Sequence, residues 1–583
     1  STTPAAQRTG ISTAQLTAEP FHIGVNSVDV PFVSVTSGDW NVGTTWNKGT
    51  VPTCTDFATI ANGHTVTSTT SGNVARNVTI ATGGTLEVSA GDLTVGCTLN
   101  NNTLANSGTL TVSGGLLAVN GNMVHDAASI FNQSGGDILV DGNEGGVAAN
   151  SVASGVAIVQ LNSQFINWTG GALTILDPHA NTTASNTLAF NNSTAHVNVP
   201  NTHTLKLGDG VSTDAGGNAT NGFRLSTFVG SRRISFGNLE VNTTGGTNRQ
   251  VTTASNIGFN GNVTIEPSSE VVFGTSYVAG NIVNNGTFTS TAVLGLASYT
   301  DGTVSATTNA QTIGGSGVYR NLAAAPTANL TSLTVNNTNA TGVTLSVPLS
   351  VSGTLTMTSG IINTTTTNLL TLGTATAAGI LAGTPSATNM VRGPFVRTIA
   401  NANANTNYLL FPVGKTTYAP IWAAPATTAV SVMKAETFDT NTGTQSAAIA
   451  NMATNRRWEL PLVSGTINDI NVRLGDAGIL TTSIPVQAPS ASGLYTSTFG
   501  SVATAVAGVS TQSTTPVLSA SYTGFLSYAD SNACVGVPTP GNTIASSNSI
   551  CLGTSVTLSL QNLTTGSGVT YQWFSSPDGV TYA

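Results

Sequence analysis

Apolar and polar residues alternate in short stretches along most of the chain. From residue 77 the sequence runs NVTI, TLEV, LTV, TLTV, LLAV and DILV, and Gly, Asn, Ser or Asp residues separate the stretches. Alternation with a period of two places one face of a strand in the core. The breaks come too often for tight hairpins throughout. The pattern therefore predicts a three-sided coil whose turns stack about 4.8 Å apart.

The predicted core of this coil is a ladder of aliphatic residues that lie five to eight positions apart. Its members are Leu86, Leu93, Leu99, Leu104, Leu110, Leu117, Met123, Ile130 and Ile138. Three such steps make a turn of about 20 residues, which is a usual length for a solenoid repeat. FNQSGG at 131–136 returns as INWTGG at 166–171, so some turns carry insertions. Asn102, Asn106 and Asn143 are predicted to form corners with left-handed backbone.

The pattern divides the chain into four parts and predicts an all-β fold. Residues 1–39 form an N-terminal extension, and residues 40–385 form a right-handed parallel β-helix with an N-terminal cap. Residues 386–533 contain longer apolar strands and longer loops, which favour a β-sandwich. A propeller or a series of sandwiches is the alternative to the β-helix, but both need strands of about five or more residues.

The last part follows the linker VPTPGNT. SICLGTSVTLSL and VTYQWFSSPDG are typical of the opening strands of an Ig-like domain, in which a Trp packs on a Cys. We assign residues 534–583 to an incomplete Ig-like domain. Because such a domain needs about 100 residues, we expect the natural chain to continue beyond Ala583.

The composition narrows the classes of function. Charged residues make up 7% of the chain, with 16 Lys and Arg against 24 Asp and Glu, whereas an average domain has about 25%. So few cations exclude a nucleic-acid partner. The sequence contains no run of about 18 apolar residues, so we expect no membrane span. Because Ser1 is not an initiator Met and no leader precedes it, we expect a processed, exported and extracellular or cell-surface protein.

Three stretches resemble large surface proteins that Bacteroidetes export by type IX secretion. They are SGDWNVGTTWNKGTVPTCTDFATIANGHTVT at 37–67, the pair MVRGPFVRTI and YLLFPVGKTTYAPI within 390–421 together with RRWEL at 456–460, and CLGTSVTLSL with YQWFSSPDG within 551–579. In those proteins the first opens a β-helix, the second follows it, and the third is a repeated Ig-like module. The resemblance implies an adhesin or a structural surface component, and its motifs carry no catalytic residues.

Aromatic and sulfur-bearing residues near the N-terminus leave alternatives open. Trp40 and Trp46 either stack on sugars or cap the open end of the first coil, and we expect the cap. His64 is then a hydrogen-bonding residue at a strand end. A disulfide between Cys54 and Cys97, 43 residues apart, and a pair of free buried thiols are both open.

The remaining cysteines, Cys534 and Cys551, flank the linker. They pair either with each other or with partners beyond Ala583, and their spacing does not decide between these outcomes.

The carboxylates do not form a recognisable catalytic set. Asp137, Asp141 and Glu144 are the best acidic group, but the Asp-Asp, Gly-His-Gly and Arg-x-Lys motifs of polygalacturonases are missing. We expect a solvated turn there. Asp209 and Asp214 lie in a Gly/Asn-rich loop that is either a weak calcium site or a bare loop, and we expect the bare loop.

Two pairs of basic residues complete the candidates. Arg232 with Arg233 and Arg456 with Arg457 are expected to be solvated or salt-bridged at the surface. We therefore predict no catalytic residue, no cofactor and no resident metal.

These observations favour a non-enzymatic extracellular adhesin or stalk-like surface component. Its expected partners are glycans or other cell-surface ligands, other surface proteins, or copies of itself. One alternative is a self-assembling fibre or sheath subunit, since low charge and long β edges permit head-to-tail association. A second alternative is a carbohydrate-active β-helix enzyme, either a polysaccharide lyase or a hydrolase.

Overall fold

The computed structural model is all-β over the residues that it describes. Its regular elements are strands and short 3₁₀ turns such as Gly43–Thr45, and the described residues contain no α-helix. No helical segment in the described part has the length and apolar character needed to cross a membrane. The described residues are 30–97, 102–141, 157–178, 186–211, 222–244, 249–253, 256–322, 328–531, 541–562 and 573–574.

The chain forms two compact units. Unit 1 comprises Ser1–Val278, Asn284–Phe288 and Ser298–Val304. Unit 2 comprises Ala279–Val283, Thr289–Ala297 and Ser305–Ala583.

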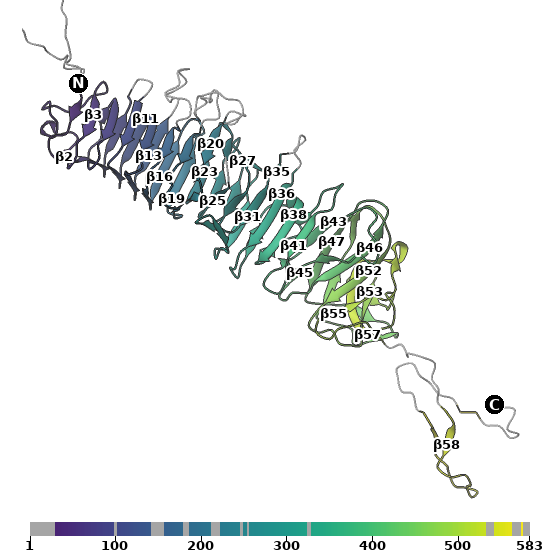
Figure 1. Cartoon of the computed structure of the whole chain (residues 1–583). Coiled ribbons are helices and arrows are strands. Elements are labelled where there is room, and N and C mark those ends of the chain that lie inside the picture. Colours follow the sequence, from purple (N-terminus) through teal and green to yellow (C-terminus); the bar gives the residue numbers. More distant parts are fainter. Residues whose placement is uncertain are drawn as a thin grey trace, which may run out of the picture. The chain divides into compact units, whose positions relative to one another are not determined.

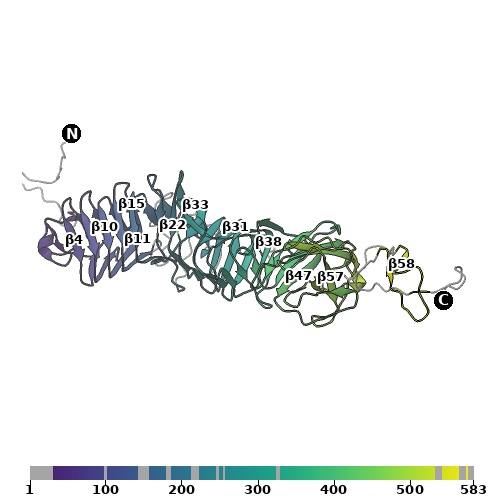
Figure 2. The ribbon, with the colours of Figure 1, turned by 90° about the horizontal axis from the view of Figure 1, so that it is seen from below.

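Unit 1 is a parallel solenoid. One coil consists of β4 (Thr65–Ser68), β5 (Asn73–Ala75) and β6 (Asn77–Ile80), and the next begins with β7 (Thr85–Val88). β7 pairs in parallel with β4, one coil earlier. Successive coils therefore stack strand on strand, as the rows of arrows in Figures 1 and 2 show. This confirms the parallel, β-helix-like architecture that the alternation predicts.

Three sheets form the faces of these coils, and each is named here by its strands. Sheet 1 contains β2 (Gly38–Asp39), β4, β7, β10 (Thr109–Val112), β12 (Ile130–Gln133) and β15 (Phe165–Trp168). Sheet 2 contains β5, β8 (Asp92–Val95), the first half of β11 (Leu116–His125), β13 (Asp137–Asp141), β16 (Gly171–Ile175), β19 (His203–Leu207) and β23 (Asn238–Val241). Sheet 3 contains β3 (Phe57–Ile60), β6, β9 (Asn102–Asn106), the second half of β11, β14 (Val159–Leu161), β17 (Leu188–Phe190), β20 (Phe223–Ser226) and β24 (Val251–Thr253).

The core of unit 1 follows the predicted ladder with one correction. The buried members, all 0% exposed, are Leu86, Leu93, Leu104, Leu110, Leu117, Met123 and Ile138. Leu99 lies outside the described residues. The prediction for Ile130 is wrong, because Ile130 pairs with the outward-facing Thr109 and the next residue, Phe131, pairs with Leu110. Phe131 is 0% exposed and takes the core position.

The outward face of sheet 1 carries a row of hydroxyl and amide side chains. Thr111, Asn132 and Asn167 are aligned on successive strands. The Asn167 side-chain amide donates to Asn132 Oδ1 at 2.8 Å, and the Asn132 amide donates to Thr111 Oγ1 at 3.3 Å. The same register aligns 131–133 with 166–168 and confirms the repeat seen in the sequence.

Glycine, rather than asparagine, provides the left-handed corners of these coils. Gly115 and Gly136 both have φ of 64°, and a Cβ on Gly115 would collide with the main-chain oxygen of Gly91. The left-handed prediction is wrong for Asn102 and Asn106, which begin and end strand β9.

The buried Asn106 serves its corner through its side chain. Its amide nitrogen donates to Ile130 O at 2.9 Å, and its Oδ1 accepts from Gly108 N–H at 3.1 Å. An amide that satisfies the corner in this way leaves its own backbone extended. Asn143 lies outside the described residues.

The two tryptophans lie inside the first coil. Trp40 is 1% exposed and Trp46 is 2% exposed, and their rings meet edge to face at 4.9 Å. The Trp46 indole N–H donates to Trp40 O at 2.9 Å. Sugar stacking needs an exposed ring face, so that alternative is wrong and the rings fill the end of the coil. His64 Nδ1 lies 2.9 Å from Ser34 O, which agrees with the expected hydrogen-bonding role at a strand end.

A disulfide fastens this first part of the solenoid. It joins Cys54, which precedes β3, to Cys97, which follows β8, and their Cα atoms lie 5.4 Å apart. Of the two states that the sequence left open, the structure has the disulfide. Cys551 is a free and exposed thiol, and Cys534 lies outside the described residues.

Unit 2 begins with parallel ladders and changes to antiparallel pairing. One parallel ladder runs through β34 (Gln311–Gly314), β37 (Val343–Leu345), β39 (Ile362–Asn363), β42 (Val391–Arg392) and β45 (Val413–Gly414). The other runs through β36 (Leu330–Asn336), β38 (Leu349–Ser359), β40 (Leu370–Leu372) and β43 (Phe395–Ile399). β43 then pairs antiparallel with β47 (Ser431–Phe438), which ends the solenoid pattern on that ladder.

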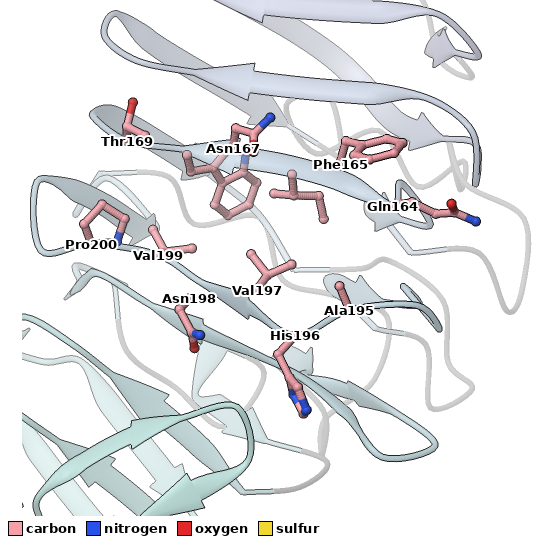
Figure 3. Close-up of a pocket in the computed structure, with 12 residues that line it drawn as sticks. Gln164, Phe165, Asn167, Thr169, Ala195, His196, Val197, Asn198, Val199 and Pro200 are labelled. Carbon is pink, nitrogen blue, oxygen red and sulfur yellow. The ribbon is translucent and has the colours of Figure 1, made fainter. Parts of the chain in front are cut away.

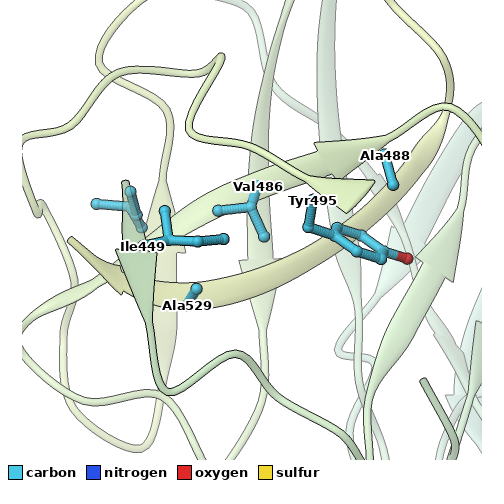
Figure 4. Packing of buried hydrophobic residues seen from close by; sticks show 6 residues of the cluster. Ile449, Val486, Ala488, Tyr495 and Ala529 are labelled. Carbon is cyan, nitrogen blue, oxygen red and sulfur yellow. The ribbon is translucent and has the colours of Figure 1, made fainter. Parts of the chain in front are cut away.

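Two antiparallel sheets follow in unit 2. One includes β47, β50 (Arg457–Glu459), β53 (Ser483–Ala488) and β57 (Phe525–Ser531), and the other includes β44 (Leu409–Phe411), β46 (Ile421–Thr427), β52 (Ile467–Gly475) and β55 (Ser510–Gln512). Figure 4 shows a buried cluster of this region, made of Ile449, Ile484, Val486, Ala488, Tyr495 and Ala529. Further along, β58 (Thr543–Ala545) and β59 (Leu558–Leu560) form an antiparallel hairpin.

The core ladder makes a direct prediction about stability. Leu110→Asp should lower the free energy of unfolding by several kcal/mol, because an unpaired carboxylate would replace a side chain that is 0% exposed. Thr111→Asp on the same strand faces outward and serves as the control. Denaturant and thermal unfolding of the two variants check this, and equal losses would contradict the assigned faces.

The disulfide makes a second prediction. Replacing Cys54 and Cys97 together by Ser should cost about 2 to 4 kcal/mol of stability, because the crosslink no longer restricts the unfolded chain. Thermal unfolding with and without a reducing agent measures the difference. A double variant whose melting temperature is unchanged and insensitive to reductant would contradict the expectation.

Candidate functional site

A groove opens on unit 1 where sheet 1 ends. Among the described strands, β15 pairs on one side with β12 and on its other side with none. The strand one coil later on this face, β18 (Val197–Asn198), begins a new ladder and pairs with β22 (Arg232–Phe236). Figure 3 shows β15 and β18 with the groove between them. The cavity measures about 290 Å³.

The hydrogen bonds of the two walls show which main-chain groups are directed to the groove. Thr169 N–H donates to Gln133 O of β12 at 2.7 Å. Because successive residues of a strand direct their main-chain groups to opposite edges, Ile166 and Trp168 direct theirs to the groove. On the other wall, Val199 N–H donates to Ser235 O at 2.9 Å. The main-chain groups of residues 198 and 200 are therefore directed to the groove. Residue 200 is Pro, which has no N–H to donate.

Both ends of the groove are closed by side chains. Thr202 Oγ1 donates to Thr169 O at 2.6 Å, and the Asn192 amide reaches Gln164 O at 3.5 Å. The two coils therefore contact each other beyond both ends of β15, and the groove is only as long as this strand.

No Asp, Glu, Lys or Arg lines the groove, and polar and apolar side chains share its walls. Its lining residues are Gln164, Phe165, Ile166, Asn167, Trp168, Thr169, Ala195, His196, Val197, Asn198, Val199 and Pro200. In Figure 3, Val197 and Val199 point toward β15, whereas His196 and Asn198 point away from it. Phe165 is 53% exposed at the rim. The indole N–H of Trp168 is buried and has no hydrogen-bond partner among the described residues.

A column of buried rings lies behind the groove. His125 stacks on Phe131 at 4.2 Å, Phe131 meets Trp168 edge to face at 5.4 Å, and Trp168 stacks on His203 at 4.8 Å. His203 Nε2 donates to Gln133 Oε1 at 3.0 Å, and the Gln133 amide donates to Ala172 O at 2.8 Å. Burial lowers the pKa of His125 to about 3 and that of His203 to about 4, so both rings are neutral at pH 7.

The acidic residues singled out in the sequence do not gather into a site in the described residues. Asp137 is exposed at the start of β13, Asp141 ends that strand, and Glu144 lies outside the described residues. Asp209 is exposed and its Oδ1 accepts from Val211 N–H at 2.9 Å. Asp214 lies outside the described residues. Where the chain is described, no group of three His, Cys, Asp or Glu side chains is placed to hold a metal ion.

The basic pairs need one correction. Arg456 is not a surface residue, since it is 6% exposed. Its Nε pairs with Asp476 at 2.6 Å, and its Nη1 pairs with Asp439. Tyr528 donates to Asp476 at 3.2 Å. An arginine with two carboxylates and a tyrosine thus joins strands of unit 2 in an ionic network in which Arg456, Asp476 and Tyr528 are buried and Asp439 is partly exposed.

The hydrogen bonds of this network affect Asp439. Burial acts to raise the pKa of Asp439, but the hydrogen bonds from Thr416 and Arg456 outweigh it and hold the pKa below its ordinary value. Arg457 stacks on Phe438 at 3.9 Å and pairs with Glu459. Arg232 and Arg233 are half-buried, as expected near a surface, and Arg233 lies over the Phe228 ring at 4.5 Å.

Sequence reasoning did not find the groove, although a signal is present. FNQSGG and INWTGG end in a Gly-Gly corner, whereas VNVPNT at 197–202, whose buried Val197 and Val199 match the inward positions of those segments, has Asn-Thr there and Pro just before it. That change marks the coil at which the ladder of sheet 1 stops.

No protein-family model, curated protein or solved structure matches this chain. The resemblance to Bacteroidetes surface proteins therefore stays a prediction from the motifs alone.

The burial of His125 and His203 should make the stability of the fold depend on pH. Each has a folded-state pKa below the ordinary 6.5, so the unfolded state binds more protons below pH 6.5 and acidification favours unfolding. Each histidine should remove about 1.4 kcal/mol per pH unit below that point. Melting temperatures of the wild type and His203→Gln between pH 6.5 and 5, where carboxylates change little, test this. The variant should lose about half of the pH dependence, and an unchanged slope would contradict the burial of a neutral His203.

Proposed function

We propose that the chain is a non-enzymatic, exported protein of the cell surface that acts as an adhesin or a stalk. The observation that carries the proposal is the outward row of sheet 1, where Thr67, Thr111, Asn132 and Asn167 repeat from coil to coil above a buried, largely apolar core, with Glu87 as the one charged member between Thr67 and Thr111. Each coil adds hydroxyl and amide groups at a fixed spacing of about 4.8 Å. Such a face gives a ligand many weak contacts in series.

The proposed domain plan follows the sequence. Residues 40–385 are a right-handed β-helix that presents the binding face, residues 386–533 are a β-sandwich, and residues 534–583 belong to an Ig-like module. The partners are glycans or other cell-surface ligands. Export follows the type IX route of the Bacteroidetes proteins that the motifs resemble.

A second candidate function is that of a fibre or sheath subunit. The β58–β59 hairpin favours it, because Ile544 is 48% exposed and Leu558 is 44% exposed. A two-stranded hairpin is marginal by itself, and exposed apolar side chains on it favour association with another chain. Negative-stain imaging of the purified chain distinguishes filaments from separate molecules.

The adhesin proposal predicts binding without turnover. Purified chain should bind cells or immobilised glycans and should release no product from pectin, alginate, xylan or chitin, with or without calcium. The double variant Thr111→Lys, Asn132→Lys should weaken binding at least about fivefold, because two ammonium groups would replace a hydroxyl and an amide that lie side by side in the outward row. The double variant Thr94→Lys, Thr174→Lys, with both changes at outward positions of sheet 2, is the matched control.

Two outcomes would overturn this proposal. One is turnover that disappears in an Asp137→Ala, Asp141→Ala double variant, which would indicate an enzyme. The other is binding that the sheet 1 and sheet 2 lysines reduce equally, which would place the binding face elsewhere.

A further inference from the structure

We propose that the groove between β15 and β18 binds a short extended peptide of uncharged residues, which adds a strand between the two ladders. This inference goes beyond the proposed surface function, because strand addition requires neither a glycan nor a location at the cell surface. Three features of the groove support it.

The first feature is the main chain of the two walls. Thr169 is bonded to β12 and Val199 to β22, so Ile166 and Trp168 on one wall and residue 198 on the other direct main-chain groups into the groove. The main chain of an extended peptide offers N–H donors and C=O acceptors that can pair with these groups. Strand addition to an exposed sheet edge is a general mode of peptide recognition.

The second feature is the indole of Trp168. This side chain is 2% exposed, lines the groove, and has a buried Nε1–H without a partner among the described residues. A buried donor without an acceptor is unfavourable. A ligand carbonyl oxygen that reached this N–H would supply the acceptor, and a peptide carries one on every residue.

The third feature is the character and length of the groove. No Asp, Glu, Lys or Arg lines it, and Val197 and Val199 lie on one wall, so a charged ligand side chain would lose its hydration there without a carboxylate, ammonium or guanidinium partner. The closed ends at Gln164 and Thr169 limit the site to about four residues of strand. Phe165 stands exposed at the rim, where it can cover an apolar ligand side chain.

Calorimetric titration of the 583-residue chain tests the proposal. The probe is an acetylated and amidated Thr-Val-Ala-Val peptide, which has no charge and matches the length of the site. Saturable binding with one site per chain is expected. The same peptide N-methylated at alternate residues keeps its side chains but loses strand pairing on one edge, and it should bind at least tenfold more weakly. Cellotetraose tests the other ligand class and should not bind at this site.

Variants locate the binding. Phe165→Ala should weaken the peptide at least about fivefold, and Phe57→Ala, an exposed phenylalanine on β3, should leave the affinity unchanged. Ile166→Pro removes a groove-facing N–H and should abolish binding while circular dichroism and the melting temperature show that the chain is folded.

Three results would overturn the proposal. They are no saturable heat up to about 1 mM peptide, equal affinity for the N-methylated peptide, and cellotetraose binding that depends on Phe165. If the peptide binds but the chain does not attach to cells, strand addition stands and the adhesin function fails.

Discussion

Parallel main-chain pairing between successive coils is the constraint on which the solenoid depends. Each coil is held by bonds to the coils before and after it, so its inward residues must stay in phase with theirs. Leu86, Leu110 and Phe131 stay in phase over three coils of sheet 1. This phase also fixes the outward face, because residues between core positions must point to solvent.

The groove forms where this constraint is relaxed. Sheets 2 and 3 continue their pairing through β16–β19 and β14–β17, but sheet 1 stops at β15. A corner with Pro200 follows β18, and the two strands part between closed ends. The molecule thus leaves strand edges open within an otherwise paired ladder, next to a buried indole and a neutral His203. Such an opening is a local break in the pattern rather than a separate domain.

Periodicity in the sequence was enough to predict the parallel coils and most of the core, because alternation and repeat length report directly on inward and outward positions. It failed at Ile130, where two adjacent apolar residues made the phase ambiguous and only pairing with Leu110 selects Phe131. It also failed at Asn106, whose role depends on a side-chain bond to another coil.

Long-range contacts explain the remaining misses in the candidate sites. The burial of Arg456 depends on Asp439 and Asp476, which are distant in sequence. The groove depends on a pairing that is missing, and the loss of the Gly-Gly corner in that coil becomes a signal only once the register between coils is known. The Thr and Asn face was visible in composition, but its alignment into a row required the register between coils.

Residue-resolved amide hydrogen exchange tests the central claim, that main-chain pairing holds the coils and is lost between β15 and β18. The account predicts slow exchange at Thr169 and Val199, which are bonded to β12 and β22, and fast exchange at Ile166 and Trp168, which face the groove. Equal protection of all four amides would contradict it, because it would mean that sheet 1 continues through β18 without a break.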